Sequence, residues 1–366
     1  MLPVGEHWDT SIRTLGAKAV RLALADSGNL NPDAIYIGNG LANILSHQAN
    51  LGALISEQSG YPGIESCTFE AAGASGAAAF RAACMAVQSG YVDVAVALGV
   101  EKIAEGDGTT ASAAQDLMLN YEFEGSFGLT AAAQAALLAQ RYISEYGLQK
   151  DIFQNISLQA YNHARGNPNA MFRQGLTEGT YQKQTVKNDP LRLYDIASLA
   201  DGAAALVVTR EELVPSECRE KVIRVLGSAN AIAPLSLHDR RQMLQYSAAT
   251  QSAATALRKA GMSLEDIDLF ELWDAYGIDT ALSLEAIGLA QPGKGWQTNK
   301  LHLSSMGGCL GRGNPLGASS AYQLVETVLQ LRGEAGACQV DKLPKTALVQ
   351  ALGGLGSTAV THILGQ

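Results

Sequence analysis

The sequence predicts a duplicated α/β protein, built from two similar halves that each alternate strands with helices. Its 366 residues are 47% apolar and 17% charged, which is enough apolar material for one large core or two fused smaller ones. Strand-like and helix-like hydrophobic patterns alternate along the chain, as in a largely parallel sheet with helices on both faces. The alternation occurs twice in a similar order, which indicates an internal duplication.

The second half, 214–366, shows the complete order of elements. Short apolar runs predict five strands over 221–230, 268–272, 301–304, 346–352 and 357–364. Amphipathic or apolar segments predict three helices over 246–260, 276–288 and 315–333. The first of these helices ends before Gly261, a residue type that commonly follows a helix.

The first half, 1–213, repeats most of this order but opens differently. Its strands are predicted over 34–37, 66–71, 92–98 and 203–209, and its helices over 11–27, 48–58 and 74–89. A polar insertion over 101–199, with helices near 130–145 and 151–165, separates the last two strands. No strand precedes the first helix, although the second half begins with one. The loss of an interior strand would leave neighbouring backbone groups unpaired, which is costly.

Composition and charge exclude several classes of protein. The net charge of -9 argues against a nucleic-acid-binding surface, which needs clustered Lys and Arg. The five cysteines are irregularly spaced with no CxxC pair, and the six histidines have no metal-ligand spacing, so no disulfide framework or metal site is expected. No apolar run approaches the roughly 20 residues of a membrane helix, and the start, MLPVGEHWDTS, has no signal-peptide pattern. A cytoplasmic protein is predicted.

Four segments carry a resemblance to a known family. They are EAAGASGAAAFRAACMAVQSG (70–90) with YVDVAVALGVEKI after it, DGAAALVV (201–208), GGCLGRGNPLGAS (307–319) and LGGLGSTAVTHIL (352–364). Together, and in this order, they resemble the thiolases, and GVEK and THIL are similar to the sterol-carrier-protein-type and archaeal-type branch. The resemblance spans essentially the whole chain. It implies the five-layer α-β-α-β-α thiolase fold and a C2 homodimer, with the insertion over 101–199 covering the site.

The resemblance also implies that the usual catalytic side chains are replaced. A thiolase needs a cysteine thiolate at the start of a buried helix, a histidine to deprotonate it, and often a second cysteine as acid/base. Gly73 corresponds to the nucleophile, Asn314 to the histidine and Ala351 to the second cysteine. Trp273 corresponds to the Asn or His that orients a water or carbonyl. None of these side chains performs thiolase chemistry, so no catalytic residue is assigned and ordinary thiolysis is not expected.

The backbone of the family's site is expected to remain. The N–H groups of Gly73 and Gly353 correspond to the family's main-chain oxyanion hole, which needs no side chain. Tyr276 and Cys309 are candidates for substrate contact, with packing as the alternative for both.

Three nearby residues are assigned structural roles. Ser75 lacks a visible histidine partner and belongs to the scaffold rather than acting as a nucleophile. Asp274 is expected to cap the helix over 276–288. Cys84 is expected to pack as a small apolar residue.

Three hypotheses about function follow. The first is a non-condensing thiolase-family protein of lipid or acyl-CoA metabolism, which binds a coenzyme A thioester but no covalent cofactor. Relatives in this branch associate with a small zinc-ribbon/OB-fold protein that helps to bind acyl-CoA, so such a partner is possible here. The second is a retro-aldolase that cleaves a β-hydroxyacyl-CoA, as in thiolase-like aldolases that also lack the cysteine. The third is a structural subunit or a decayed thiolase. Fold alone does not choose among them.

Overall fold

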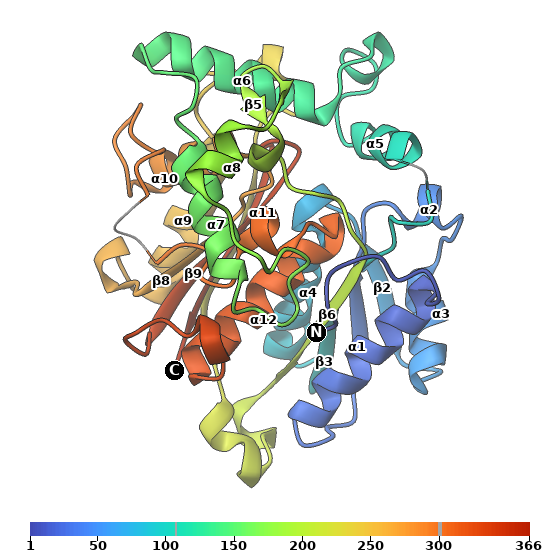
Figure 1. The fold of residues 1–366 in the computed structure, drawn as a ribbon. Helices are drawn as coiled ribbons and strands as arrows, with labels where there is room; N and C mark the ends of the chain where they lie inside the picture. The colour runs from blue at the N-terminus through green and yellow to red at the C-terminus, as the bar shows by residue number, and fades with distance from the viewer. Residues whose placement is uncertain (107, 299–301) are drawn as a thin grey trace.

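Two four-stranded sheets form the framework of the protein. The structure is a computed structural model that describes residues 1–106, 108–298 and 302–366. The N-terminal half supplies one sheet and the C-terminal half the other, and the ribbon shows them side by side with helices between and around them (Figure 1).

The N-terminal sheet has the strand order β2-β1-β3-β6. Strands β1 (Ala34–Gly38), β2 (Glu65–Phe69) and β3 (Val94–Glu101) run parallel, while β6 (Gly202–Thr209) is antiparallel to β3. Every residue of β1 and β3 is buried, which explains their continuous apolar runs, because a parallel sheet is covered on both faces. Helices α1 (Ile12–Asp26) and α3 (Leu51–Ser59) pack on one face of this sheet.

The C-terminal sheet has the strand order β7-β10-β9-β8. Strands β8 (Leu269–Leu272) and β9 (Thr346–Gly353) are parallel, and β10 (Thr358–Gly365) is antiparallel to β9 and to β7 (Arg224–Ile232). Helices α9 (Ser247–Ala260) and α10 (Gly277–Ile287) pack on its outer face.

Two buried helices, α4 (Ser75–Ser89) and α12 (Ser319–Arg332), lie between the sheets. Their apolar side chains share one core with both sheets, through residues such as Phe80, Leu324 and Val349. The two helices approach closely because small residues meet: a Cβ added at Gly76 would lie 2.8 Å from the backbone nitrogen of Ala321. The order is therefore α-β-α-β-α, and the expected five-layer fold is confirmed.

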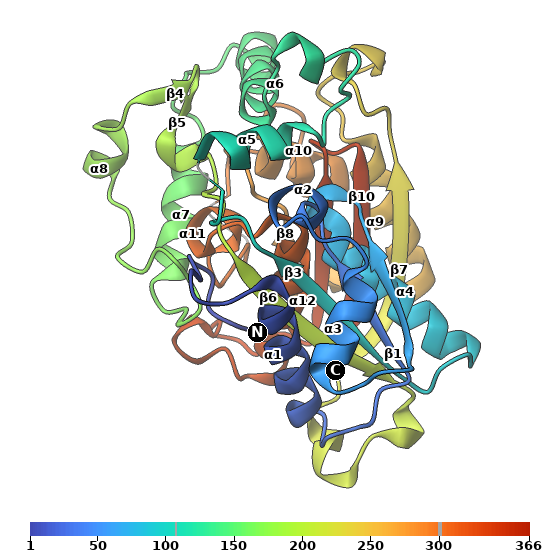
Figure 2. The same cartoon turned by 90° about the vertical axis from the view of Figure 1, so that its right-hand side faces the viewer.

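The insertion lies at one end of the two sheets, at the top of Figures 1 and 2. Its described residues form α-helices and one short hairpin, besides two 3₁₀ turns. They are α5 (Gly108–Asp116), α6 (Ala131–Tyr146), α7 (Gln154–Ala164), α8 (Glu178–Gln182), β4 (Val186–Asn188) and β5 (Leu191–Arg192). Helices α6 and α7 share a core with α10, so the insertion packs directly on the C-terminal half.

Three details differ from the sequence-based expectation. The helix expected over 315–333 is divided into a 3₁₀ turn, Leu316–Ala318, and α12. A short α-helix, α11 (Gly308–Arg312), forms within the glycine-rich loop. The strand expected over 301–304 is reduced to a bridge between Leu303 and Phe270, and Leu301 lies outside the described residues.

The outer edge of β6 differs from the equivalent edge of the C-terminal sheet. In the C-terminal half, β7 pairs with the outer side of β10. In the described part of the N-terminal half, the outer edge beside β6 has a bridge between Gly5 and Asp201 and a hydrogen bond from the Leu2 N–H to the Ala203 carbonyl (2.9 Å).

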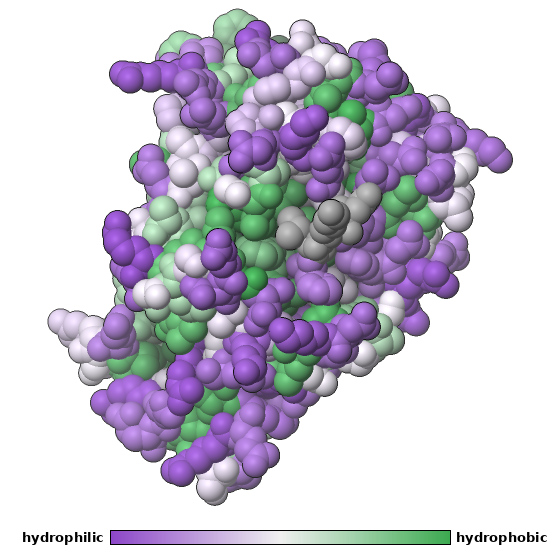
Figure 3. Space-filling view, turned by 90° about the vertical axis from the view of Figure 1, so that its left-hand side faces the viewer, coloured by the Kyte–Doolittle hydropathy of each residue, from purple (hydrophilic) through white to green (hydrophobic). Residues whose placement is uncertain are grey.

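The surface shows two general features. Figure 3 turns the left-hand side of Figure 1 toward the viewer. On this face, apolar side chains gather near the middle and polar ones surround them. Within the described ranges, no helix has the length and apolar character needed to cross a membrane.

Candidate functional site

The corner between β2 and α4 places Gly73 at the start of a buried helix. Ala72 has a φ of +50°, a left-handed conformation that is rare for a residue with a side chain and that turns the chain sharply. The hydroxyl of Ser75 accepts a hydrogen bond from the Ala71 N–H (2.9 Å) and donates one to the Ala72 carbonyl (2.6 Å). Ser75 is thus fully used in holding the turn, in agreement with its expected scaffold role.

The indole of Trp273 fills the space next to Gly73. A Cβ added to Gly73 would lie 2.2 Å from Cη2 and 2.4 Å from Cζ2 of Trp273, and 2.7 Å from the carbonyl oxygen of Leu352. Trp273 directly follows β8 and is 6% exposed. The site therefore excludes any side chain at position 73 while the indole keeps this position.

Gly353 approaches the same corner from the end of β9. A Cβ added there would lie 2.3 Å from the carbonyl oxygen of Ala71, so only glycine allows the two backbones to meet. Ala351, two residues earlier, is completely buried and pairs with Val360 of β10. The structure thus brings Gly73, Trp273 and Gly353 together. Ala351 lies in β9, the strand that ends at Gly353.

Asn314 is held by the insertion and by its own loop. Its side-chain Oδ1 accepts a hydrogen bond from the Ser319 hydroxyl (2.7 Å). Its backbone N–H donates to Ser198 (2.9 Å) and its carbonyl accepts from Ala200 (3.2 Å). Ser320, in the first turn of α12, accepts a hydrogen bond from the Ala77 N–H of α4 (3.0 Å). The glycine-rich loop is therefore bonded to the end of the insertion, and the helix that follows it is bonded to the helix that follows Gly73.

Tyr246 and Tyr276 belong to the same core as Trp273, and Tyr246 is bonded to the buried Asp279. Tyr246 donates a hydrogen bond to Oδ1 of Asp279 (2.7 Å), whereas Oδ2 of Asp279 is buried without a hydrogen-bond partner in the described part of the chain. Burial raises the pKa of Asp279 to about 7. Tyr276 is 6% exposed and lies 3.5 Å from Nε2 of Gln115 in α5, so the insertion covers this side of the site.

Asp274 organises the glycine-rich loop, and its expected role as cap of the helix at 276–288 is wrong. Helix α10 follows Tyr276 and has no side-chain cap. Instead, Oδ1 of Asp274 accepts a hydrogen bond from the Cys309 N–H (2.6 Å), and its carboxylate also accepts one from the Leu310 N–H at the start of α11. Burial raises the pKa of Asp274 to about 6 despite these bonds. The sequence analysis missed this role because Cys309, at the start of α11, lies 35 residues away from Asp274 in sequence.

Cys309 has the environment of an inert thiol. It is completely buried, and burial, assisted by the nearby Asp274 carboxylate, raises its pKa well above the usual value. A reactive cysteine needs a lowered pKa, because the thiolate is the nucleophile. Cys84 is half-buried rather than fully buried, and burial raises its pKa to about 12. Both thiols therefore fit the expected packing role better than a chemical one.

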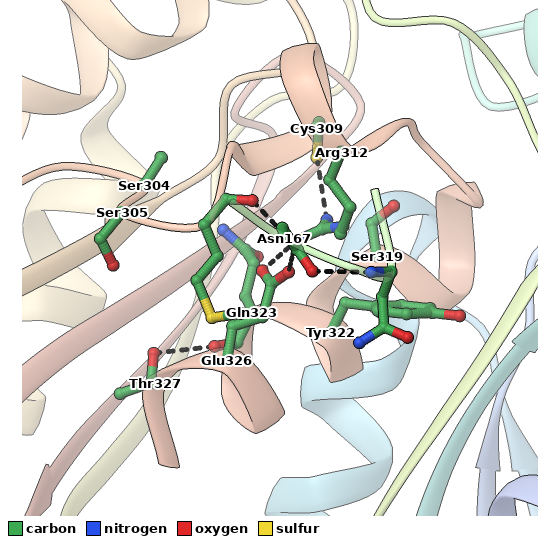
Figure 4. Close-up of polar contacts among 12 residues, drawn as sticks. Asn167, Ser304, Ser305, Cys309, Arg312, Ser319, Tyr322, Gln323, Glu326 and Thr327 are labelled. Carbon is green, nitrogen blue, oxygen red and sulfur yellow. Dashed lines mark hydrogen bonds and ion pairs between the residues drawn. The ribbon is translucent and has the colours of Figure 1, made fainter. Parts of the chain in front are cut away.

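A buried polar cluster connects the glycine-rich loop to α12. The guanidinium of Arg312 forms an ion pair with Glu326 of α12, both side chains being essentially inaccessible. Asn167 donates to the same carboxylate (2.9 Å) and to the carbonyl of Met306 (2.9 Å). Figure 4 shows Cys309, Arg312, Asn167 and Glu326 converging above α12. Glu271 has one oxygen without a partner among the described residues, and burial, with the nearby Glu326, raises its pKa well above the usual value.

These buried acids predict that stability decreases as pH rises from the usual carboxylate pKa toward and through neutrality. Burial raises the pKa of Glu101, Asp274 and Asp279 in the folded protein to between about 6 and about 7. The folded state therefore holds protons that the unfolded state has released, so the free energy of unfolding falls as pH rises toward and through these values. His362, whose pKa is lowered to about 4, opposes this only below its unfolded value of 6.5. Urea unfolding should give a higher free energy at pH 6.5 than at pH 8; equal values would contradict the prediction.

The fold and the site define a thiolase-like protein, and comparisons with known proteins agree. The chain matches the thiolase N-terminal domain over residues 1–212 and the thiolase C-terminal domain-like family over residues 229–366. It is 34% identical to an acetyl-CoA acetyltransferase of Methanothermobacter thermautotrophicus, over 99% of this chain and 96% of that one. Rat sterol carrier protein 2 is 28% identical, over 75% of this chain and 54% of its own length. The chain therefore belongs to the thiolase superfamily, as a sterol-carrier-protein-type thiolase-like protein.

Solved structures of the same fold include an aldolase as well as thiolases. The Ltp2-ChsH2(DUF35) aldolase superimposes with a TM-score of 0.81 at 22% identity, covering 99% of this chain and 96% of that one. The Acat5 thiolase from Ascaris suum, in complex with coenzyme A, superimposes with a TM-score of 0.75 at 18% identity, covering 100% and 97%. At these identities the comparison establishes the fold.

Three residues of the site were missed by the sequence analysis. Tyr246, Asp279 and Gln115 come from α9's N-terminal boundary, α10 and α5, and only folding brings them to Tyr276. One weak signal pointed to Asp279, because an acidic residue in the first turn of an otherwise apolar helix is seldom buried unless it has a partner.

Proposed function

We propose that this protein binds a coenzyme A thioester of lipid or acyl-CoA metabolism at the Gly73–Trp273–Gly353 corner and does not catalyse cysteine-dependent thiolysis. The observation that carries the proposal is the 2.2 Å approach of the Trp273 indole to the position where a side chain at residue 73 would begin. A nucleophilic side chain has no room there. The positions that the family resemblance assigns to the base and to the second cysteine hold Asn314 and Ala351, which do not exchange protons.

The backbone at this corner supports thioester binding. The chain turns at Ala72 into α4, so the N–H groups at the helix start lack partners within the helix and suit a carbonyl oxygen. Gly353 lies against Ala71 on the other side. A thioester carbonyl held by Gly73 and Gly353 would be polarised without a side chain. Because Trp273 and Tyr276 are almost completely buried, we infer that the indole or α5 moves when the ligand enters.

Thiolysis and binding are to be measured on the same preparation. With acetoacetyl-CoA and coenzyme A, we expect no acetyl-CoA formation above background. Isothermal titration calorimetry with acetyl-CoA or a longer acyl-CoA should show binding to the same protein. Formation of acetyl-CoA would contradict the proposal that the protein does not catalyse thiolysis. Cys309 would then be the candidate nucleophile. If no acyl-CoA binds, either to the chain alone or to the chain with a partner protein, the proposed ligand is wrong.

We further infer that the protein works in a complex. A site that is closed in the isolated chain favours a partner that opens it or completes it. Two comparisons support this: the Ltp2-ChsH2(DUF35) aldolase is named as two components, and the benzoylsuccinyl-CoA thiolase subunit BbsB of Thauera aromatica, 30% identical over 96% of this chain and 92% of that one, is named as a subunit. The expected partner is a small zinc-ribbon/OB-fold protein, and affinity purification of the tagged chain from its native cytoplasm should recover it.

A homodimer is also expected, and β2 is the edge that would form it. Glu65, Cys67 and Thr68 are exposed on this strand, whose only paired strand among the described residues is β1. Two such edges pairing across a two-fold axis would satisfy their free backbone groups. In Cys67→Lys, like charges would meet at the axis, so light scattering should show a shift from dimer toward monomer. Ile232→Lys, at a 74% exposed position on the other sheet, should leave the mass unchanged. A wild-type monomer would contradict the proposal.

A second candidate function is retro-aldol cleavage, favoured by the acid–phenol pair of Asp279 and Tyr246. Oδ2 of Asp279 has no hydrogen-bond partner in the described part of the chain, burial raises the pKa of Asp279 to about 7, and Tyr246 donates to Oδ1. A base of this kind can take the hydroxyl proton of a β-hydroxyacyl-CoA. The Cα–Cβ bond then breaks, its electrons pass to the thioester as an enolate, an aldehyde or ketone leaves, and a proton returns to Cα.

Asp279→Asn and Tyr276→Phe test this candidate. If a panel of β-hydroxyacyl-CoA substrates yields an aldehyde or ketone with the wild type, we expect Asp279→Asn to lower kcat by about 10²-fold or more, as for loss of a general base. Tyr276→Phe, which keeps the ring, should affect KM or kcat less. No carbonyl product from any member of the panel would eliminate the candidate and leave the binding role.

A further inference from the structure

The hairpin that follows Gly353 has a strained backbone. Gly354, Leu355 and Gly356 have φ values of +52°, +43° and +76°, so three consecutive residues adopt a left-handed conformation. This conformation is rare for a bulky residue such as leucine, and it persists only where the surrounding structure fixes it. Ser357 closes the hairpin, because its N–H donates to the Gly354 carbonyl (3.0 Å) and its hydroxyl donates to the Gly353 carbonyl (3.0 Å). The position of Gly353 therefore depends on what fixes this hairpin.

The half-buried side chain of Arg240 bonds the hairpin to the loop at 234–240. Its Nη1 donates to the Leu355 carbonyl (2.9 Å), and its Nε donates to the Pro234 carbonyl (3.1 Å). A longer contact of 3.5 Å joins Nη2 to the Leu235 carbonyl. These bonds use the planar, rigid fork of the guanidinium, which a lysine ammonium on its flexible stem does not reproduce. Arg240 therefore holds the hairpin and the loop at a fixed separation.

The same loop is bonded to the insertion. Asn120 donates a side-chain N–H to the Ser236 hydroxyl (2.8 Å), and Glu124 accepts a hydrogen bond from the Leu237 N–H (3.1 Å). The insertion lies over this end of the two sheets (Figure 2). The loop at 234–240 thus connects the segment that covers the site with the hairpin that follows Gly353.

Arg240 also brings a positive charge close to buried acids. Burial lowers the pKa of Arg240, and the ionisable groups of Tyr246, Glu124 and Asp279 oppose this. An arginine stays protonated in a protein, so the cation remains in this environment. Two variants separate charge from geometry: Arg240→Lys keeps the charge and loses the fork, whereas Arg240→Met loses both.

We propose that Arg240 is a positioning residue of the thioester site, which keeps Gly353 against the Gly73 corner by fixing the hairpin that follows it. This role rests on the proposed function, because it concerns the same site. Gly353 is expected to hold the thioester carbonyl, so Arg240 should matter for ligands that carry this carbonyl and not for ligands that lack it. A side chain with a purely structural role would affect both kinds of ligand alike.

The test compares acetyl-CoA with S-ethyl-CoA, a thioether of nearly the same size that lacks the carbonyl. Calorimetry gives both dissociation constants, and their ratio is the measured quantity. In Arg240→Met, acetyl-CoA binding should weaken by about 10-fold or more relative to S-ethyl-CoA binding, as for the loss of one hydrogen bond. Arg240→Lys should lose most of the same preference, because the charge alone does not fix the hairpin. An unchanged ratio in Arg240→Met would overturn the proposal.

Arg192→Met is the matched control. Arg192 also donates to two backbone carbonyls, those of Gln184 (2.8 Å) and Gln182 (3.3 Å), but all three residues belong to the insertion. Arg192→Met should leave the ratio of the two dissociation constants unchanged. A ratio that falls equally in both variants would show a general effect of destabilisation and would overturn the role of Arg240.

A spectroscopic measurement reports on the carbonyl itself. With ¹³C-labelled acetyl-CoA, the infrared stretch of the thioester carbonyl should move to lower frequency on binding to the wild type, and this shift should be lost in Arg240→Met. Hydrogen exchange without ligand should show faster exchange of the Ser357 amide in Arg240→Met than in Arg192→Met. If the wild type binds neither ligand, the proposed function is wrong. If the wild type binds acetyl-CoA and Arg240→Met keeps the infrared shift, only the role of Arg240 is wrong.

Discussion

Gly73→Cys should destabilise the protein by about 1–3 kcal/mol and should produce no thiolase activity, because the new side chain overlaps the indole of Trp273. The added Cβ would lie 2.2 Å from a ring atom and 2.7 Å from the backbone oxygen of Leu352, and the sulfur would need still more space. A simple replacement of a missing nucleophile would instead leave stability nearly unchanged. Urea unfolding of the two proteins at pH 7 measures the difference.

A double-mutant cycle with Trp273→Ala tests the cause. Trp273→Ala alone should cost about 3–5 kcal/mol, as for truncation of a buried tryptophan. In the Gly73→Cys background the same truncation should cost less, because it also relieves the overlap. A coupling of about 1 kcal/mol or more is expected for side chains in contact. Additive effects would show that Trp273 does not occupy the position next to residue 73.

Arg312→Met should destabilise the protein by about 3–5 kcal/mol at pH 8, and by clearly less at pH 5.5. The guanidinium is fully buried, forms an ion pair with Glu326 and lies over the ring of Tyr322 at 5.2 Å. Its removal leaves a buried carboxylate without a cation, the usual origin of such a large loss. That carboxylate will take up a proton, so its folded-state pKa rises above the unfolded value. The loss therefore grows as pH rises through the range between these two values.

The control for this prediction is the double variant that carries both Arg312→Met and Glu326→Gln. Without an ionisable group at position 326, the additional pH dependence of Arg312→Met should disappear, while the cost of the altered packing remains. Urea unfolding at the two pH values, for the wild type and both variants, completes the test. A loss of the same size at both pH values in Arg312→Met would mean that Glu326 is not left as a buried anion.

Much of the fold could be predicted from hydrophobic periodicity. Strands β1 and β3 are buried on both faces, so their apolar runs are continuous and easily distinguished from the helices around them. Elements with weak patterns were missed, such as α5 and α11, because each is stabilised by contacts with distant segments more than by its own sequence. The role of Asp274 was assigned to the wrong helix for the same reason.

The sequence by itself determined the five-layer fold, the family and the residue types at the family's site positions. Only the tertiary structure determined that the Trp273 indole occupies the space next to Gly73, that Tyr246 and Asp279 join Tyr276, and that Arg240 bonds to the hairpin after Gly353. The physical reason is that periodicity and motifs report how each segment faces its own core. Contacts between side chains from distant segments depend on how the layers pack, and no local pattern encodes them.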